Sequence, residues 1–203
     1  MCMKAETKSD APHVPRMLIE LEVRDRDGKV IQRYKQEAKS FVWNFMSILF
    51  NLFSGSTTIL FQYYSPAQGC VQQTQSFTSA SDFSVEAPSG NDSYGILIGS
   101  GNAPNSPMQC ALETKIPNST MAYGSTSVSN TLSVNNNTNT ITFTITRQFT
   151  NNSGSTQTVA EVGLAINGGN TYPLIARDVL SSSVSVPNGG TLTVTYTIEL
   201  TVT

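Results

Sequence analysis

The stretch SFVWNFMSILFNLFS, residues 40–54, is the only long segment whose pattern predicts an α-helix. Its polar residues recur every three or four positions, which places them in one narrow stripe of a helix; they are Ser40, Asn44, Ser47, Asn51 and Ser54. The other ten residues are apolar. A helix that is apolar around most of its circumference must be covered on nearly every side, by its own sheets or by a neighbouring subunit.

The sequence also indicates where this helix begins and ends and which environments it does not suit. Ser40 is expected as the N-cap and Gly55 as the stop signal. A membrane span needs roughly 20 apolar residues, and an interfacial helix needs Lys or Arg on its polar face; neither condition is met. Two alternatives remain, a core helix closing one end of the fold and a helix shared between subunits. We expect the Ser and Asn stripe to be either its wet side or a hydrogen-bonded interface between copies.

The rest of the chain has the pattern of β-strands. Residues 17–23, 139–150 and 191–203 alternate apolar and polar side chains, which is typical of strands with one wet face. Shorter strands are expected at 29–35, 57–64, 94–98, 156–166, 174–179 and 183–186, separated by turns rich in Asp, Asn, Ser and Gly. The pattern predicts a mainly β protein, an antiparallel β-sandwich of jelly-roll or immunoglobulin-like type with an N-terminal hairpin and one apolar helix.

The domain organisation is predicted to be simple. Residues 1–16 are charged and contain prolines, and we expect a flexible N-terminal arm there. Residues 17–203 then form a single sandwich domain with the helix at 40–54. Residues 65–91 lose all periodicity, and we expect a long excursion that is functional or forms an interface.

Charge and cysteine usage exclude several classes of function. Charged residues make up 13% of the chain and the net charge is −2, so nucleic acid is not an expected partner. The N-terminal 39 residues hold nine of the twelve basic residues. Cys2, Cys70 and Cys110 are widely spaced and are expected to be free thiols. His13 is the only histidine, so no metal site is expected. The N-terminus also lacks the apolar segment of a signal peptide.

No catalytic arrangement is visible in the sequence. Glu161 and Arg177 lie among apolar neighbours, with Asp178 beside them, and are expected to form a buried ion pair. An active site would need a second acid, a base or a metal, and a glycosidase would need paired carboxylates. The motif GSGNA at 99–103 is a weak phosphate-binding signal because no helix pattern follows it. We therefore expect no enzyme activity, no catalytic residues and no cofactor.

Three runs of sequence resemble one group of proteins: YGILIGSGNAPNSPMQCALETKI, FTITRQFTNNSGSTQTVAEVGLAINGG and LIARDVLSSSVSVPNGGTLTVTYTIEL, within residues 94–200. They are similar to virion proteins of tailed bacteriophages and related viruses, as is the helix segment that follows a short hairpin. The resemblance implies a structural component of a virus particle, assembled in the host cytoplasm. It carries no catalytic residues.

These observations predict a capsid decoration or cement protein that binds the major capsid lattice and its own copies, with a trimer favoured. The alternative is a tail- or fibre-associated adhesion module that binds a ligand on the host surface. No cofactor, nucleic acid or membrane is an expected partner. The expected interface residues are the aromatic ones of the helix segment and the strand after it: Phe41, Trp43, Phe45, Phe50, Phe53, Tyr63 and Tyr64.

Overall fold

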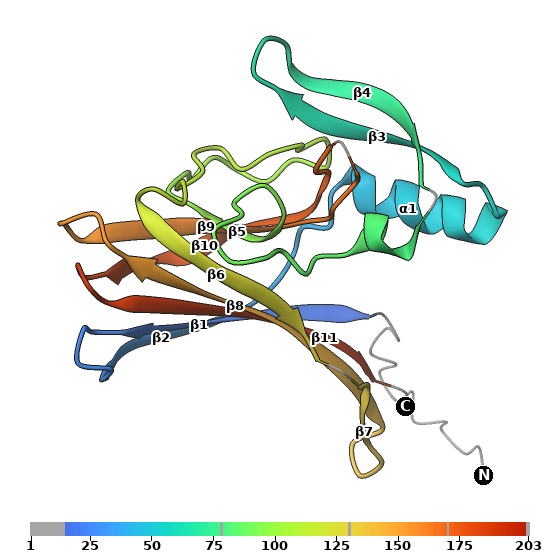
Figure 1. The fold of residues 1–203 in the computed structure, drawn as a ribbon. Helices are drawn as coiled ribbons and strands as arrows, with labels where there is room; N and C mark the ends of the chain where they lie inside the picture. The colour runs from blue at the N-terminus through green and yellow to red at the C-terminus, as the bar shows by residue number, and fades with distance from the viewer. Residues whose placement is uncertain (1–14, 78, 130, 170, 202–203) are drawn as a thin grey trace, which may run out of the picture.

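The computed structural model describes residues 15–77, 79–129, 131–169 and 171–201, and within them it is mainly antiparallel β-structure (Figure 1). The larger sheet has six strands in the order β2-β1-β11-β8-β6, with β7 paired to β8. Its strands are β1 (Arg16–Arg24), β2 (Val30–Glu37), β6 (Met121–Val128), β7 (Ser133–Asn135), β8 (Thr140–Asn151) and β11 (Thr191–Thr201).

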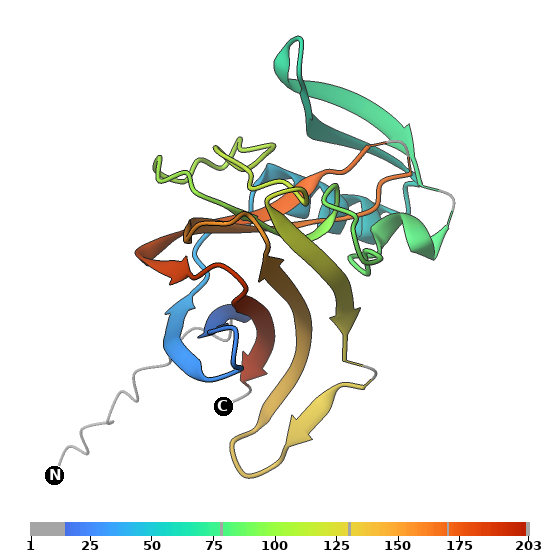
Figure 2. The same ribbon diagram turned by 60° about the vertical axis from the view of Figure 1, so that its left-hand side comes forward.

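A second sheet lies against the first. It has three strands in the order β10-β9-β5, which are β5 (Gly95–Gly99), β9 (Gln157–Ala165) and β10 (Leu174–Val186). Figures 1 and 2 show the two sheets as facing layers, and their facing apolar side chains form one core. The predicted mainly β, antiparallel sandwich is therefore confirmed, whereas the jelly-roll or immunoglobulin-like type stays a prediction.

The alternating pattern predicted the strand faces correctly. Met17, Ile19, Leu21 and Val23 of β1 are at most 2% exposed, and Ile19 lies opposite Tyr196 of β11 in the antiparallel register. The threonines of β8 and β11 lie on the other face, where Thr146 is the register partner of Thr195. Burial of one face by the second sheet produces this period of two.

Residues 65–91 contain more regular structure than the sequence predicted. Strand β3 (Thr58–Ser65) pairs with β4 (Gly69–Ser76) as a two-stranded hairpin, and a 3₁₀ helix follows at Ala80–Phe83. Figure 1 shows the hairpin projecting away from the sandwich. Most of β4 is exposed, so its sequence carries no apolar alternation. The expectation of a wholly irregular excursion is therefore wrong.

Three smaller differences concern strand limits. Strand β6 was not predicted, and residues 174–186 form one strand whose register shifts between Val179 and Val184 where two strands were expected. Arg16 belongs to β1 and pairs with Glu199, so the arm expected at residues 1–16 does not include it. Pro15 is exposed, and residues 1–14 of that arm lie outside the described residues.

The predicted helix is present but begins later. Helix α1 spans Trp43–Ser54, with Val42 at the N-cap position and no side-chain cap. Ser40 is not the N-cap, because Phe41 pairs with Ala176 of β10 and the Ser40 carbonyl accepts a hydrogen bond from the Arg177 N–H. The expected stop is confirmed, since Gly55 has the left-handed conformation with φ of 70°.

Candidate functional site: the outward helix face and the hairpin cavity

The polar stripe of α1 is the face turned toward the protein itself. Asn44 is 1% exposed and Asn51 is 7% exposed. The Asn44 side chain accepts a hydrogen bond from the Gln62 N–H and donates to the carbonyls of Gln62 and Leu174. The Ser47 hydroxyl donates to the Leu60 carbonyl. The stripe is therefore an interface within one chain, which joins α1 to β3 and β10, and both expected roles for it are wrong.

Backbone chemistry explains this orientation. Strand β3 is paired on one side only, to β4, so its other edge presents N–H and C=O groups that need partners. Side-chain amides and hydroxyls supply such partners, and aliphatic side chains do not. The helix consequently turns its Asn and Ser residues toward the strand edge.

Four apolar residues of α1 are left pointing outward, whereas Trp43, Phe45 and Ile48 pack against the core. Phe53 is 89% exposed, Phe50 is 70%, Leu52 is 61% and Met46 is 60%. Met46, Phe50 and Phe53 are spaced four and three residues apart, so they lie on one side of the helix. We call Met46, Phe50, Leu52 and Phe53 the outward helix face.

The size of this face can be estimated from the two phenylalanines. At about 200 Å² for each side chain, exposed fractions of 70% and 89% leave about 300 Å² of aromatic surface on Phe50 and Phe53. Met46 and Leu52 extend it toward the upper end of the roughly 300–600 Å² that the largest apolar patch of a monomer reaches. Patches of this size are often functional.

The expected interface residues divide into two groups. Phe50, Phe53 and Tyr64 are exposed, with Tyr64 at 56%. Trp43 and Phe45 are half-buried against the core, and Phe41, which is 37% exposed, stacks on Phe45 with ring centroids 3.9 Å apart. Tyr63 lies at intermediate exposure on β3. The sequence identified the aromatic exposed surface but missed the contributions of Met46 and Leu52.

A cavity of about 710 Å³ lies between the hairpin and the body. We call it the hairpin cavity. Its walls combine tyrosines with charged and small apolar side chains, and include Tyr63, Tyr64, Asp92, Leu112, Glu113, Lys115 and Tyr172. Sequence reasoning had named only the first two. The others come from three separate segments, which only the folded chain brings together.

A disulfide and a pair of side-chain hydrogen bonds hold the hairpin against the body. A disulfide joins Cys70 of β4 to Cys110, with Cα atoms 5.8 Å apart. The expectation that both are free thiols is therefore wrong, because the fold brings together cysteines that lie 40 residues apart in sequence. Near the other end of β4, the Gln75 side chain accepts a hydrogen bond from the Thr171 hydroxyl and donates to the Gly168 carbonyl.

The predicted ion pair of Glu161 and Arg177 is confirmed. The two side chains are 0% and 1% exposed, and Arg177 Nε lies 2.7 Å from Glu161 Oε2. The Glu161 carboxylate also accepts hydrogen bonds from the N–H groups of Gly101, Glu113 and Thr114. Charge-assisted bonds of this kind satisfy a buried carboxylate. The pair holds the 101–114 segment, and with it one wall of the hairpin cavity, on β9 and β10.

The same contact explains the GSGNA motif. A Cβ added at Gly99 would lie 2.4 Å from Glu161 Oε1, so the position has no room for a side chain. The backbone N–H of Gly101, which a phosphate-binding loop would direct at its ligand, is donated to Glu161. The motif accommodates a carboxylate of the chain itself.

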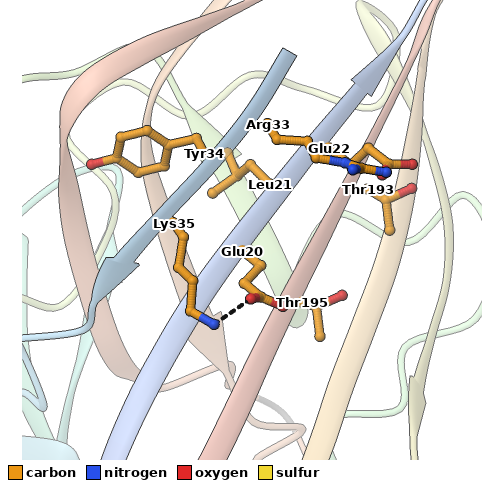
Figure 3. Close-up of a pocket in the computed structure, with 8 residues that line it drawn as sticks. All are labelled: Glu20, Leu21, Glu22, Arg33, Tyr34, Lys35, Thr193 and Thr195. Atoms are coloured by element: carbon orange, nitrogen blue, oxygen red, sulfur yellow. Dashed lines mark hydrogen bonds and ion pairs between the residues drawn. The ribbon is translucent and has the colours of Figure 1, made fainter. Parts of the chain in front are cut away.

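A second cavity, of about 510 Å³, lies on the larger sheet. Figure 3 shows Glu20, Glu22, Arg33 and Lys35 side by side on β1 and β2, with two threonines of β11 next to them. Lys35 pairs with Glu20, and Arg33 donates to Glu22, which lowers the pKa of that carboxyl. These charges satisfy one another at the surface, as is usual for a solvated sheet face.

The described residues show neither of two features that would point to a membrane or a metal. They contain no helix long and apolar enough to cross a membrane. Within the same residues, no group of three or more His, Cys, Asp or Glu side chains is arranged to hold a metal ion. Comparison of the chain with protein-family models, with curated proteins and with solved structures gave no match.

Proposed function

We propose that this protein is a structural component of a virus particle, a decoration or cement subunit that binds the major capsid lattice and its own copies. The observation that carries the proposal is the outward helix face. In their exposed positions, Phe50 and Phe53 do not stabilise the fold of a single chain. Burial against a partner removes their apolar surface from water. We assign this face to a second copy of the chain.

The area supports an interface between copies. A standard interface buries about 800 Å² on each partner, and the outward helix face supplies a large apolar part of that area. Identical chains usually associate with closed symmetry, and we favour a trimer that matches a symmetric lattice. The low charge content of 13% also suits a protein held in an assembly.

The disulfide is compatible with a location on the particle surface. Disulfides persist on virion surfaces and are rare in the cytosol, where thiols are kept reduced. Cys70 is exposed, so a subunit assembled in the host cytoplasm would close the Cys70–Cys110 bond when the particle meets oxidising surroundings.

A second candidate function is an adhesion module on a tail or fibre. The hairpin cavity favours it, because Tyr64 and Tyr172 are 56% and 40% exposed in a concave site. Tyrosine combines an apolar ring with a polar tip and is typical of binding surfaces.

The experiment that separates the two roles is a count of copies in purified virus particles, together with a low-resolution image of them. A decoration protein occurs in many copies spread over the shell, and an adhesion module occurs in few copies at one vertex. Absence of the protein from the particles contradicts both roles.

Self-association is tested on the purified protein. We expect light scattering to show a closed oligomer at micromolar concentration, and the double variant Phe50→Ser/Phe53→Ser to be monomeric with an unchanged fold. Leu132→Ser is the matched control, since Leu132 is 64% exposed but lies outside the outward helix face. A monomeric wild-type protein, or an oligomer that the double variant leaves intact, contradicts the assignment of this face.

A further inference from the structure

We infer that the hairpin cavity is a binding site for a short neutral saccharide. This inference deepens the second candidate function and rests on the cavity itself. Its volume of about 710 Å³ falls within the roughly 300–1,000 Å³ typical of small-molecule sites. About half of the cavity lining is apolar and half is polar. The apolar part suits the C–H face of a sugar ring, and the polar part suits its hydroxyl groups.

The apolar half includes tyrosines from two segments of the chain. Tyr63 and Tyr64 come from β3, and Tyr172 comes from the segment before β10. The Tyr172 ring is parallel to the Tyr94 ring within 6°, with centroids 5.6 Å apart, so its orientation is set by stacking. The flat face of an aromatic ring accepts the C–H groups on one face of a sugar. The part of the chain that the structure describes gives the phenol groups of Tyr63, Tyr64 and Tyr172 no hydrogen-bond partner.

The polar half consists of side chains that are already held in place. The Asp92 carboxylate accepts a hydrogen bond from the Asn118 N–H, and Glu113 accepts one from the Ala103 N–H. A carboxylate has about four acceptor positions, so both groups retain capacity for the hydroxyls of a sugar. Their side chains are 27% and 39% exposed.

The charge of the cavity selects against anions. Lys115 Nζ lies 3.3 Å from Asp92 Oδ1, and Arg177 Nη2 lies 3.6 Å from Glu113 Oε2. A phosphate, nucleotide or acidic sugar would therefore meet cations that are already paired and carboxylates that repel it at short range. A neutral polyol with many hydroxyl donors fits this set of acceptors.

The site is also preorganised. Cys70 is the register partner of Tyr64 in the hairpin, so its disulfide to Cys110 fixes the strand position that carries the ring. On the same strand, Asn44 holds both backbone groups of Gln62. A wall fixed before binding loses less entropy when a ligand arrives, which raises affinity.

The test uses the full-length protein on an array of neutral oligosaccharides built from glucose, galactose, mannose and N-acetylglucosamine, with sulfated and sialylated glycans as separate arms. The best neutral ligand is then titrated by calorimetry. We expect Tyr64→Ala and Tyr172→Ala each to weaken its binding about tenfold or more, and Glu113→Gln to weaken it as well. Glu20→Gln, a carboxylate on the larger sheet, is the matched control and should leave the affinity unchanged.

Thermal melting establishes whether each variant is folded. If a tyrosine variant fails to fold, Glu113→Gln and Glu20→Gln decide the question, because each keeps the size of the side chain and removes one charge from an ion pair, with Arg177 and Lys35 respectively. The inference is wrong if no neutral saccharide binds, if only acidic glycans bind, or if binding is unchanged in the cavity variants. Particle composition is a separate measurement. If the protein is absent from virus particles, the saccharide-binding data still test this inference.

Discussion

The guanidinium of Arg147 lies over the ring of Tyr123, 4.7 Å from its centroid, and is 1% exposed although no carboxylate pairs with it in the described residues. Its nitrogen atoms donate instead to backbone carbonyls of residues 88, 91, 94, 96 and 124. One side chain thus holds the loop before β5 and a bulged part of β6 on the larger sheet.

Arg147→Lys is expected to destabilise the protein although it keeps the charge. Lysine has three donors on a single atom and cannot reach carbonyls placed around a planar fork. We expect a loss of about 3 kcal/mol in the free energy of unfolding, since several buried carbonyls lose their partners. Denaturant unfolding measures it. Lys35→Arg, at an exposed ion pair, is the control, and equal stabilities of the two variants contradict this role for Arg147.

Asn44→Leu tests the interface between α1 and β3. The substitution removes three hydrogen bonds of 2.7–2.8 Å and leaves the buried backbone groups of Gln62 and Leu174 without them. We expect a loss of about 3 kcal/mol, by the cost of unpaired buried polar groups. Leu52→Ala, on the exposed side of the same helix, should change the free energy of unfolding by less than about 0.5 kcal/mol. A tolerated Asn44→Leu contradicts the account of the helix orientation.

The strands of the sandwich were predictable because two packed sheets bury alternate residues. Strands β1, β8 and β11 show this period in their sequences and were located within one or two residues. Strand β4 was not predictable in this way. Its partner is a single strand, both its faces are largely wet, and Gln and Ser therefore occupy positions that a core would fill with apolar residues.

The helix shows where periodicity stops being informative. The spacing of Asn44, Ser47 and Asn51 identified one stripe correctly, but a pattern does not state which side of a helix faces its own chain. The usual assumption places the apolar side inward. Here the unpaired edge of β3 required hydrogen-bond partners, and that requirement depends on tertiary structure. For the same reason, Tyr172 and Glu113 could not be assigned to a site with Tyr64 before the fold was known.

Glu161→Gln tests the buried ion pair. The variant removes the negative charge that faces Arg177 and leaves a guanidinium buried without its closest partner. Breaking a buried pair on one side costs about 3–5 kcal/mol. Glu20→Gln breaks the exposed pair with Lys35 and should cost under about 1 kcal/mol. Comparable losses in the two variants, measured by urea unfolding, contradict the difference that burial predicts.

Asp178→Asn is expected to stabilise the protein at neutral pH. Burial is the main cause that raises the pKa of the Asp178 carboxyl, outweighing the hydrogen bond from the Lys39 N–H, the Ser40 hydroxyl and the charge of Arg177. In the described residues, Asp178 Oδ2 has no hydrogen-bond partner. A buried carboxylate that must stay charged therefore destabilises the fold at pH 7.

The pH dependence of this effect follows from linkage. Because the folded-state pKa is raised above 3.8, the folded protein binds the proton more tightly, and the cost of the charge disappears as the carboxyl becomes protonated. The melting temperature of Asp178→Asn should exceed that of the wild type by a few degrees at pH 7, and the difference should shrink as the pH falls through the raised pKa. A constant or growing difference contradicts burial as the cause.

The disulfide between Cys70 and Cys110 is expected to stabilise the hairpin more than the sandwich. It closes a loop with a sequence separation of 40 residues, for which chain entropy predicts about 4 kcal/mol. The sandwich core includes neither Cys70 nor any other residue of β4, so Cys70→Ser/Cys110→Ser should leave it folded. Hydrogen exchange should accelerate in Gly69–Ser76 and change little in β8 and β11. Cys2→Ser is the matched control and should behave like the wild type. Mass spectrometry of the unreduced protein provides the direct check: three free thiols, or equal hydrogen exchange in the hairpin with and without reductant, contradict the link on which the cavity wall depends.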